Sequence, residues 1–139
     1  RSDLIKSLPI SWEELFKLSQ NKRVIWPLKP VHAISSFYSI YNNITEVFEP
    51  SDKDFIQNNF GIKTLQMMKL ISQHVPSECF DMDPIKTAEI LSEHDDFYYS
   101  PYTYGFSNYS RIDYRKNLLT YADVIHQVEE ATFSNILFL

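Results

Sequence analysis

The sequence has 139 residues, of which 44% are hydrophobic and 15% aromatic. This length and composition suit one globular domain with a real core, and residues 1–139 are interpreted as a single domain. The formal net charge of −5 argues against a nucleic-acid-binding surface, because neutralising phosphates requires a basic face. The densest basic cluster, Arg111 with Arg115 and Lys116, is small and typical of a solvated loop.

The single cysteine, the apolar segments and the chain ends bear on disulfides, membrane spans and targeting signals. Cys79 cannot form an intrachain disulfide and is predicted to be a small buried apolar group. No segment approaches the roughly 18 apolar residues of a membrane span, and no signal peptide is visible. The chain stops on an apolar run at residues 136–139, which is typical of a piece cut from a longer protein.

The first predicted element is a helix that begins at Ser11. Ser11 can cap the helix, and Glu14 stands three residues later in a capping-box arrangement. The apolar stripe that follows consists of Trp12, Leu15, Phe16 and Leu18. A short apolar strand is predicted at residues 24–28, ended by Pro27 and Pro30.

Three further helices are predicted. One spans about residues 33–42, and a longer one spans about residues 52–74, from a cap at residue 51 or 52. Gly61 weakens the longer helix by about 1 kcal/mol relative to alanine, so a division into two shorter helices is an alternative. Asp83 is predicted to cap the last helix, with Pro84 in its first turn.

The second half of the chain is predicted to form strands. Residues 97–102 are a β-prone aromatic run, Gly105 favours a turn, and residues 118–124 and 131–139 fit two more strands. Strand, helices and strands in this order predict an α/β fold, with helices packed on a mixed, partly parallel sheet.

Tyrosines concentrate in one segment. Seven of the nine tyrosines lie between residues 98 and 121. Tyrosine offers an apolar ring face and a hydrogen-bonding hydroxyl, and sugars present the same mixture of groups. A sugar- or polyol-binding surface is one interpretation, and a tyrosine-rich strand packed on helices is the other.

Trp26 also has two interpretations. It could contact a ligand, because ligands in open α/β sheets gather beyond strand ends, and a core position is equally consistent with the pattern.

Chemical motifs are missing from the sequence. The four histidines form no H-x-x-x-H pair, and two glycines are too few for a phosphate-binding loop; no G-x-S-x-G motif occurs. Asp81 and Asp83 suit a helix cap better than an ion site. The neighbouring carboxylates Glu13 and Glu14, like those at residues 95–96 and 129–130, are predicted to be solvated. We therefore expect no catalytic residue, no metal and no cofactor.

Four segments in collinear order resemble one protein family. Residues 11–15 (SWEEL) and 24–28 (VIWPL) are similar to a "P-x-x-W-x-E-L … V-x-x-P-L" passage of extracellular solute-binding proteins of ABC importers, of the family 1-like, sugar-type group. Residues 78–85 (ECFDMDPI) resemble that group's "P-x-C-F-x-x-N/D-P-I" segment. Residues 99–111 (YSPYTYGFSNYSR) resemble its "Y-C-P-x-x-Y-G-Y-S-N-Y-A-R" segment, and residues 118–123 its "L-x-F-A-D" strand.

The resemblance implies the second lobe of a two-lobed, type II periplasmic-binding-protein-like fold without enzymatic activity. It implies that a small solute, by family default a carbohydrate, is held between the lobes and delivered to an ABC permease. It also implies an extracytoplasmic location, periplasmic or lipid-anchored. The family's first lobe, its export signal and a Gly-rich passage after the last strand are not matched, so this lobe alone is expected to bind weakly.

Residue chemistry and position in the motifs suggest the ligand contacts. The tyrosines and the tryptophan would line the cleft, Asn108 would hydrogen-bond hydroxyls, and Arg111 would pair with a carboxylate or brace the loop. The predicted ligand-binding residues are Trp26, Tyr102, Tyr104, Asn108, Tyr109 and Arg111.

Two alternatives stay open. The chain could be a lobe of a carbohydrate-active α/β enzyme, which would need a buried acid beside the tyrosine loop, and Asp113 and Arg111 are the residues near it. It could also be a protein-interaction module whose aromatic surface contacts a partner chain.

Overall fold

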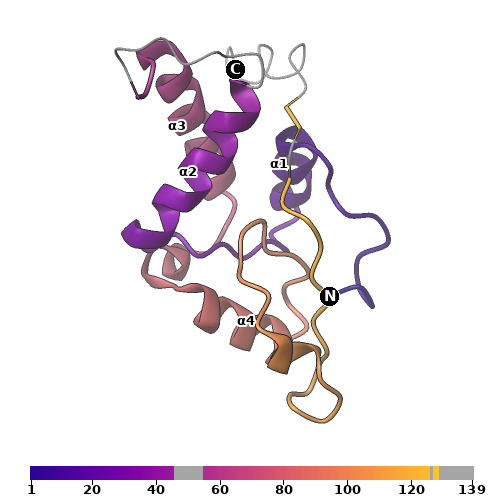
Figure 1. Cartoon of the computed structure of the whole chain (residues 1–139). Helices are drawn as coiled ribbons and strands as arrows, with labels where there is room; N and C mark the ends of the chain where they lie inside the picture. The colour runs from indigo at the N-terminus through magenta and orange to yellow at the C-terminus, as the bar shows by residue number, and fades with distance from the viewer. Residues whose placement is uncertain (46–54, 126, 129–139) are drawn as a thin grey trace.

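The computed structural model describes residues 1–45, 55–125, 127 and 128 (Figure 1). In these ranges the chain forms four α-helices and two short 3-10 helices. The elements, in chain order, are α1 (Trp12–Gln20), α2 (Pro30–Ile44), α3 (Asn58–Ser72), η1 (Ser77–Asp81), α4 (Pro84–Glu93) and η2 (Ser107–Ser110).

The predicted start of α1 is confirmed. The Glu14 N–H donates to Ser11 Oγ at 3.2 Å, so one of the unpaired amides of the first turn is satisfied. The Glu14 carboxylate in turn accepts from the N–H of Ile10 at 2.8 Å, one residue before the cap. Trp12 and Leu15, from the predicted apolar stripe, are buried.

The other predicted helices also form. Asp83 Oδ1 accepts from the Lys86 N–H at 2.8 Å, and Pro84 occupies the first turn of α4 as predicted. Helix α2 begins at Pro30, three residues earlier than predicted, because proline is tolerated at the first helical position. Gly61 lies inside α3 and does not divide it. The predicted cap of this helix at residue 51 or 52 lies outside the described residues.

The core joins the two ends of the molecule. Helix α3 packs against α1 and α2, while α4 and the segment that follows it lie at the other end (Figure 1). The ring centroids of Trp12 and Trp26 lie 6.3 Å apart. Residues from α1, α3, α4 and the extended segments form one hydrophobic cluster, which includes Leu15, Ile25, Met67, Ile71, Cys79, Leu91 and Leu119. Cys79 is fully buried, as predicted.

The predicted fold class is wrong. The chain does not form an α/β lobe of the type II periplasmic-binding-protein kind, with helices on a mixed sheet. Across the described residues, β-pairing is limited to two isolated parallel bridges, Ser11 with Gln127 and Val24 with Tyr99. The described part of the chain is mainly helical, with buried extended segments between helices.

Residues 24–28 show why the predicted strand does not extend into a sheet. All five residues are buried, and the Ile25 N–H donates to the Tyr99 carbonyl at 3.0 Å. Pro27 has no N–H, so the pairing with residues 98–99 stops there. The next amide, that of Leu28, donates to the carbonyl of Cys79 in η1 at 2.9 Å.

Residues 118–124 also have no strand partner among the residues that the structure describes. The Leu119 N–H donates to the carbonyl of Tyr109 in η2 at 2.9 Å, and the Asn117 N–H donates to the carbonyl of Ser92 in α4 at 2.8 Å. The backbone therefore pairs with helix ends and turns. The predicted strand at residues 131–139 lies outside the described residues.

One predicted surface residue is buried. Glu13 was expected to be solvated beside Glu14, but it is fully buried in α1. Adjacent helical residues differ by about 100° around the axis, so Glu13 turns inward while Glu14 reaches back to the cap. Within the ranges that the structure describes, no helix is long and apolar enough to cross a membrane.

Candidate ligand-binding site

Five aromatic rings form a continuous row along residues 102–114. Each ring meets the next edge to face, which is a favourable geometry for aromatic pairs. Centroid distances are 6.0 Å for Tyr102–Tyr104, 6.0 Å for Tyr104–Phe106, 6.4 Å for Phe106–Tyr109 and 5.5 Å for Tyr109–Tyr114. We call these five residues the aromatic row.

Tyr109 anchors the aromatic row to the core. Its side chain is buried, and its hydroxyl donates to Glu89 Oε1 on α4 at 3.3 Å. Burial, together with the negative charge of Glu89, raises the pKa of Tyr109. Arg115 ties the same loop to α4 through an ion pair with Glu89 at 2.5 Å, and it stacks over the Tyr114 ring. The loop is therefore held by both packing and charge.

Five of the six predicted ligand residues lie in or beside the aromatic row. Tyr104 is 47% exposed, Tyr102 is half-buried, and Asn108 and Arg111 are exposed. Arg111 Nη1 lies 3.5 Å from Asn108 Oδ1, so the guanidinium group and the amide are presented together. Tyr109 is buried and supports this surface from below.

Trp26, the sixth predicted ligand residue, is placed in the core. It is fully buried, and its indole N–H donates to Ser36 Oγ on α2 at 2.9 Å. The described residues form only isolated bridges and no sheet, so they provide no strand edge at which Trp26 could face a ligand. The alternative interpretation of Trp26 as a core residue agrees with the structure.

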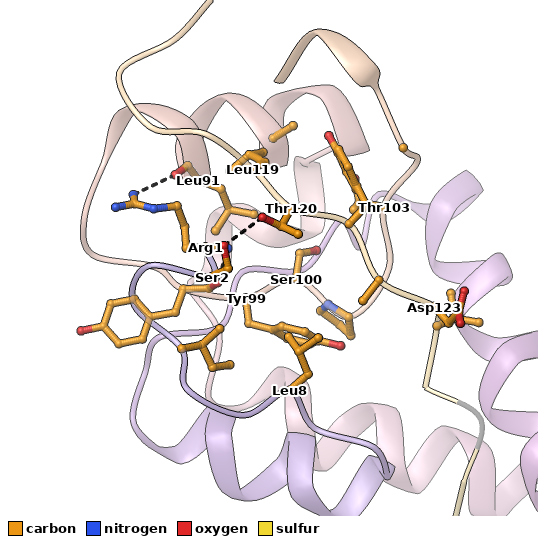
Figure 2. A pocket seen from close by; sticks show the side chains of 18 of the residues that line it. Arg1, Ser2, Leu8, Leu91, Tyr99, Ser100, Thr103, Leu119, Thr120 and Asp123 are labelled. Atoms are coloured by element: carbon orange, nitrogen blue, oxygen red, sulfur yellow. Dashed lines mark hydrogen bonds between the residues drawn. The ribbon is translucent and has the colours of Figure 1, made fainter. Parts of the chain in front are cut away.

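A pocket of about 520 Å³ lies beside the same segment (Figure 2). Its walls come from residues 1–8, from α4, and from residues 98–105 and 119–124. From residue 101 to 106 the chain alternates: residues 101, 103 and 105 line the pocket, whereas residues 102, 104 and 106 belong to the aromatic row. One short segment thus serves two surfaces.

Burial and unpaired polar groups mark the pocket. Burial raises the pKa of Tyr99 to about 12. The Thr103 hydroxyl oxygen is buried and has no hydrogen-bond partner in the described part of the chain. Asp123 is exposed at the pocket and makes no hydrogen bond or ion pair with the described residues. Thr103 and Asp123 were not among the predicted ligand residues, and the alternation of tyrosines with smaller residues after residue 100 was the signal that could have indicated Thr103.

Arg1 closes one side of the pocket. Its side chain is 3% exposed, and the guanidinium group contacts Asp3 at 2.6 Å and Asp95 at 3.1 Å. It also donates to the carbonyls of Leu91 and His94 at 3.3 and 3.2 Å. Ser2 Oγ and Thr120 Oγ1 lie 2.9 Å apart, which ties the start of the chain to the opposite wall.

The described ranges contain no group of three or more His, Cys, Asp or Glu residues that could hold a metal ion. Asp113, which the enzyme alternative needs buried, is exposed and has a φ of 65°. No protein-family model, curated protein or solved structure matches the chain.

Proposed function

We propose that this chain is part of the substrate-binding component of an ABC importer. In this proposal the aromatic row, with Asn108 and Arg111, forms one wall of a cleft that captures a small polyhydroxylated solute, most simply a sugar. The opposite wall and the permease contact would come from other parts of the importer, at an extracytoplasmic location. Neither a catalytic step nor a cofactor is part of the proposal.

The observation that carries the proposal is the joint exposure of Tyr104, which belongs to the aromatic row, and of Asn108 and Arg111 beside it. An exposed tyrosine ring can stack on the apolar face of a sugar, while the neighbouring amide and guanidinium groups hydrogen-bond its hydroxyls. Because Tyr109 is fixed by Glu89 and by the core, little ordering would be needed on binding. The four-segment resemblance supplies the transport context, and it no longer carries any argument about the fold.

Sugar titrations of the 139-residue chain, followed by backbone amide NMR, test the proposal. We expect small, saturable shifts at residues 102–111 with neutral mono- and disaccharides, and dissociation constants in the millimolar range or weaker, because one wall supplies few contacts. Tyr104→Ala and Asn108→Ala should each weaken binding several-fold, whereas Tyr104→Phe, which keeps the ring, should retain most of it.

Asn59→Ala on α3 is the matched control, because Asn59 is exposed and lies outside the aromatic row. Thermal unfolding of all four variants should stay near that of the wild type. Unchanged sugar affinity in both Tyr104→Ala and Asn108→Ala would refute the assignment.

The exposure of Ile112 favours a second candidate function. Ile112 is 82% exposed next to the aromatic row, and Tyr114 at the end of the row is 41% exposed. An exposed apolar residue beside tyrosines is typical of a protein-interaction surface. The same titration separates the two functions, because a row that serves only a partner protein gives no saturable shifts with any sugar.

A further inference from the structure

The pocket beside the aromatic row has the features of a separate small-molecule site. Its volume of about 520 Å³ lies within the range of ligand pockets in general. None of the five residues of the aromatic row lines it, and neither do Asn108 and Arg111. A ligand here would therefore contact a different set of residues from a solute bound at the row.

The polar groups of the pocket are few and lie in defined places. Figure 2 shows Arg1 and Asp123 at opposite sides of the pocket, with Tyr99, Ser100 and Thr103 between them. The Thr103 hydroxyl oxygen is buried and has no hydrogen-bond partner among the described residues, which is less favourable than a hydrogen-bonded hydroxyl. A ligand that hydrogen-bonds this hydroxyl would remove that disadvantage, which makes Thr103 a second point of recognition besides Asp123.

The apolar part of the lining defines the body of the ligand. Leu8, Leu91, Leu119 and Val124 line the pocket together with the ring of Tyr99. Burial raises the pKa of Tyr99 to about 12, which is consistent with a poorly hydrated wall. A compact aromatic or branched aliphatic group would gain from leaving water in these surroundings.

The charges at the pocket favour a cation. The Arg1 guanidinium is already paired with Asp3 and Asp95, and the Arg1 α-ammonium group donates to the Tyr98 carbonyl at 3.2 Å, so both have less capacity left to attract an anion. Asp123 has no such partner and keeps its carboxylate on a short side chain at the pocket. Lys6 also lines the pocket, but it is exposed, and its long stem allows the ammonium group to remain in water.

Aromatic side chains strengthen this preference. Tyr99 and Tyr121 line the pocket, and the face of a tyrosine ring attracts an ammonium group; the Tyr98 ring also lines it but already lies under the Arg23 guanidinium group. The Tyr121 hydroxyl donates to the Phe106 carbonyl at 3.3 Å, which holds the ring in place. From this combination we infer that the pocket is a binding site for a small organic amine, whose ammonium group pairs with Asp123 and whose apolar body contacts Leu91 and Leu119.

Three molecules of matched shape test the inference: 2-phenylethylamine, 2-phenylethanol and 3-phenylpropionate, each titrated into the 139-residue chain and followed by amide NMR. We expect saturable shifts at residues 99–103 and 119–124 with the amine, and a dissociation constant on the order of 1 mM. The alcohol should bind more weakly and the carboxylate most weakly. Asp123→Asn should lower the affinity for the amine about tenfold and leave the alcohol unaffected, because only the charged hydrogen bond is lost.

Asp96→Asn is the control, since Asp96 is an exposed carboxylate that does not line the pocket. Thr103→Val should weaken binding of the amine without lowering the unfolding midpoint, because it removes a hydroxyl that has no partner. Equal or tighter binding of 3-phenylpropionate, or an unchanged amine affinity in Asp123→Asn, would overturn the inference. Tyr104→Ala should not alter amine binding, so a failure of this inference is separate from a failure of sugar binding at the aromatic row.

Discussion

Trp26 and Ser36 form a fully buried hydrogen-bonded pair between an extended segment and helix α2. The indole N–H reaches Ser36 Oγ at 2.9 Å, and both side chains are fully shielded from water. A buried polar group that loses its partner is destabilising by about 1–3 kcal/mol, in addition to the packing lost when the ring shrinks. The pair therefore stabilises the position of residues 24–28 over α2.

Replacing Trp26 by phenylalanine tests how much the Trp26–Ser36 pair contributes to the free energy of unfolding. We expect Trp26→Phe to lower the free energy of unfolding by about 3 kcal/mol, because the Ser36 hydroxyl loses its partner and a cavity opens. The double variant Trp26→Phe/Ser36→Ala should lose less than the sum of the two single variants. Urea denaturation of the four proteins measures the difference, and strictly additive losses would contradict the pairing.

Residue chemistry alone predicted only in part which of the candidate ligand residues are exposed. Tyr104, Asn108 and Arg111 are displayed together because they follow one another in the chain, so the sequence could place them on one loop. Whether Trp26 faces a ligand or the core depended on the presence of a sheet edge, which is a non-local property. The same holds for Asp123, whose place at the pocket depends on the approach of residues 1–8.

At the scale of elements, helix starts depend on local hydrogen bonds. The Asp83 carboxylate accepts from the Lys86 amide at 2.8 Å, and Pro84 presets the first turn of α4. Helix α4 supports both candidate sites, because Glu89 anchors Tyr109 while Ala88 and Leu91 line the pocket. The cap at Asp83 thus stabilises the start of the helix that supports both candidate sites.

We expect Asp83→Ala to lower the free energy of unfolding by about 1 kcal/mol, because the first turn loses its cap. Asp81→Ala is the matched control: Asp81 is an exposed carboxylate two residues earlier that does not cap α4. Chemical denaturation followed by circular dichroism measures both. Equal effects of the two changes would show that the cap contributes nothing specific.

The helices could be predicted from the sequence because their caps and apolar stripes lie within a few residues of one another, as for Ser11 with Glu14. The sequence could not show that residues 24–28 and 118–124 stay outside a sheet, because strand pairing depends on distant partners in register. Residues 24–28 have the composition of a buried strand, yet Pro27 limits their pairing and η1 takes the next amide. Apolar content predicted the burial of these residues correctly and the formation of a sheet wrongly.

At the scale of the whole molecule, a charge cluster joins the first residues of the described chain to the end of α4. The Arg1 guanidinium hydrogen-bonds Asp3 and thereby lowers the pKa of that carboxyl. Lys116, and to a smaller extent Arg1, lower the pKa of Asp95 through hydrogen bonds. Three distant segments are thus connected by ionised groups.

This cluster predicts a dependence of stability on acid. Because the folded-state pKa values of Asp3 and Asp95 lie below the ordinary value of about 3.9, their contribution is complete above about pH 5. It is lost as the pH falls through 4 and then through the lowered values. The unfolding temperature of the wild type should therefore decrease more steeply between about pH 5 and pH 3 than that of Asp3→Asn/Asp95→Asn. Asp81→Asn/Asp96→Asn, which removes the same formal charge, should keep the wild-type slope.

The alternation along residues 101–106 makes the spacing of this segment critical. Inserting one residue after Tyr102 would exchange the two sides, turning rings toward the cavity wall and sending the Thr103 hydroxyl outward. A change of length would therefore damage both surfaces at once, whereas a change of side chain would damage one. Along these six positions the number of residues decides which side chains face the pocket and which face the aromatic row, so it matters more than the identity of any single residue.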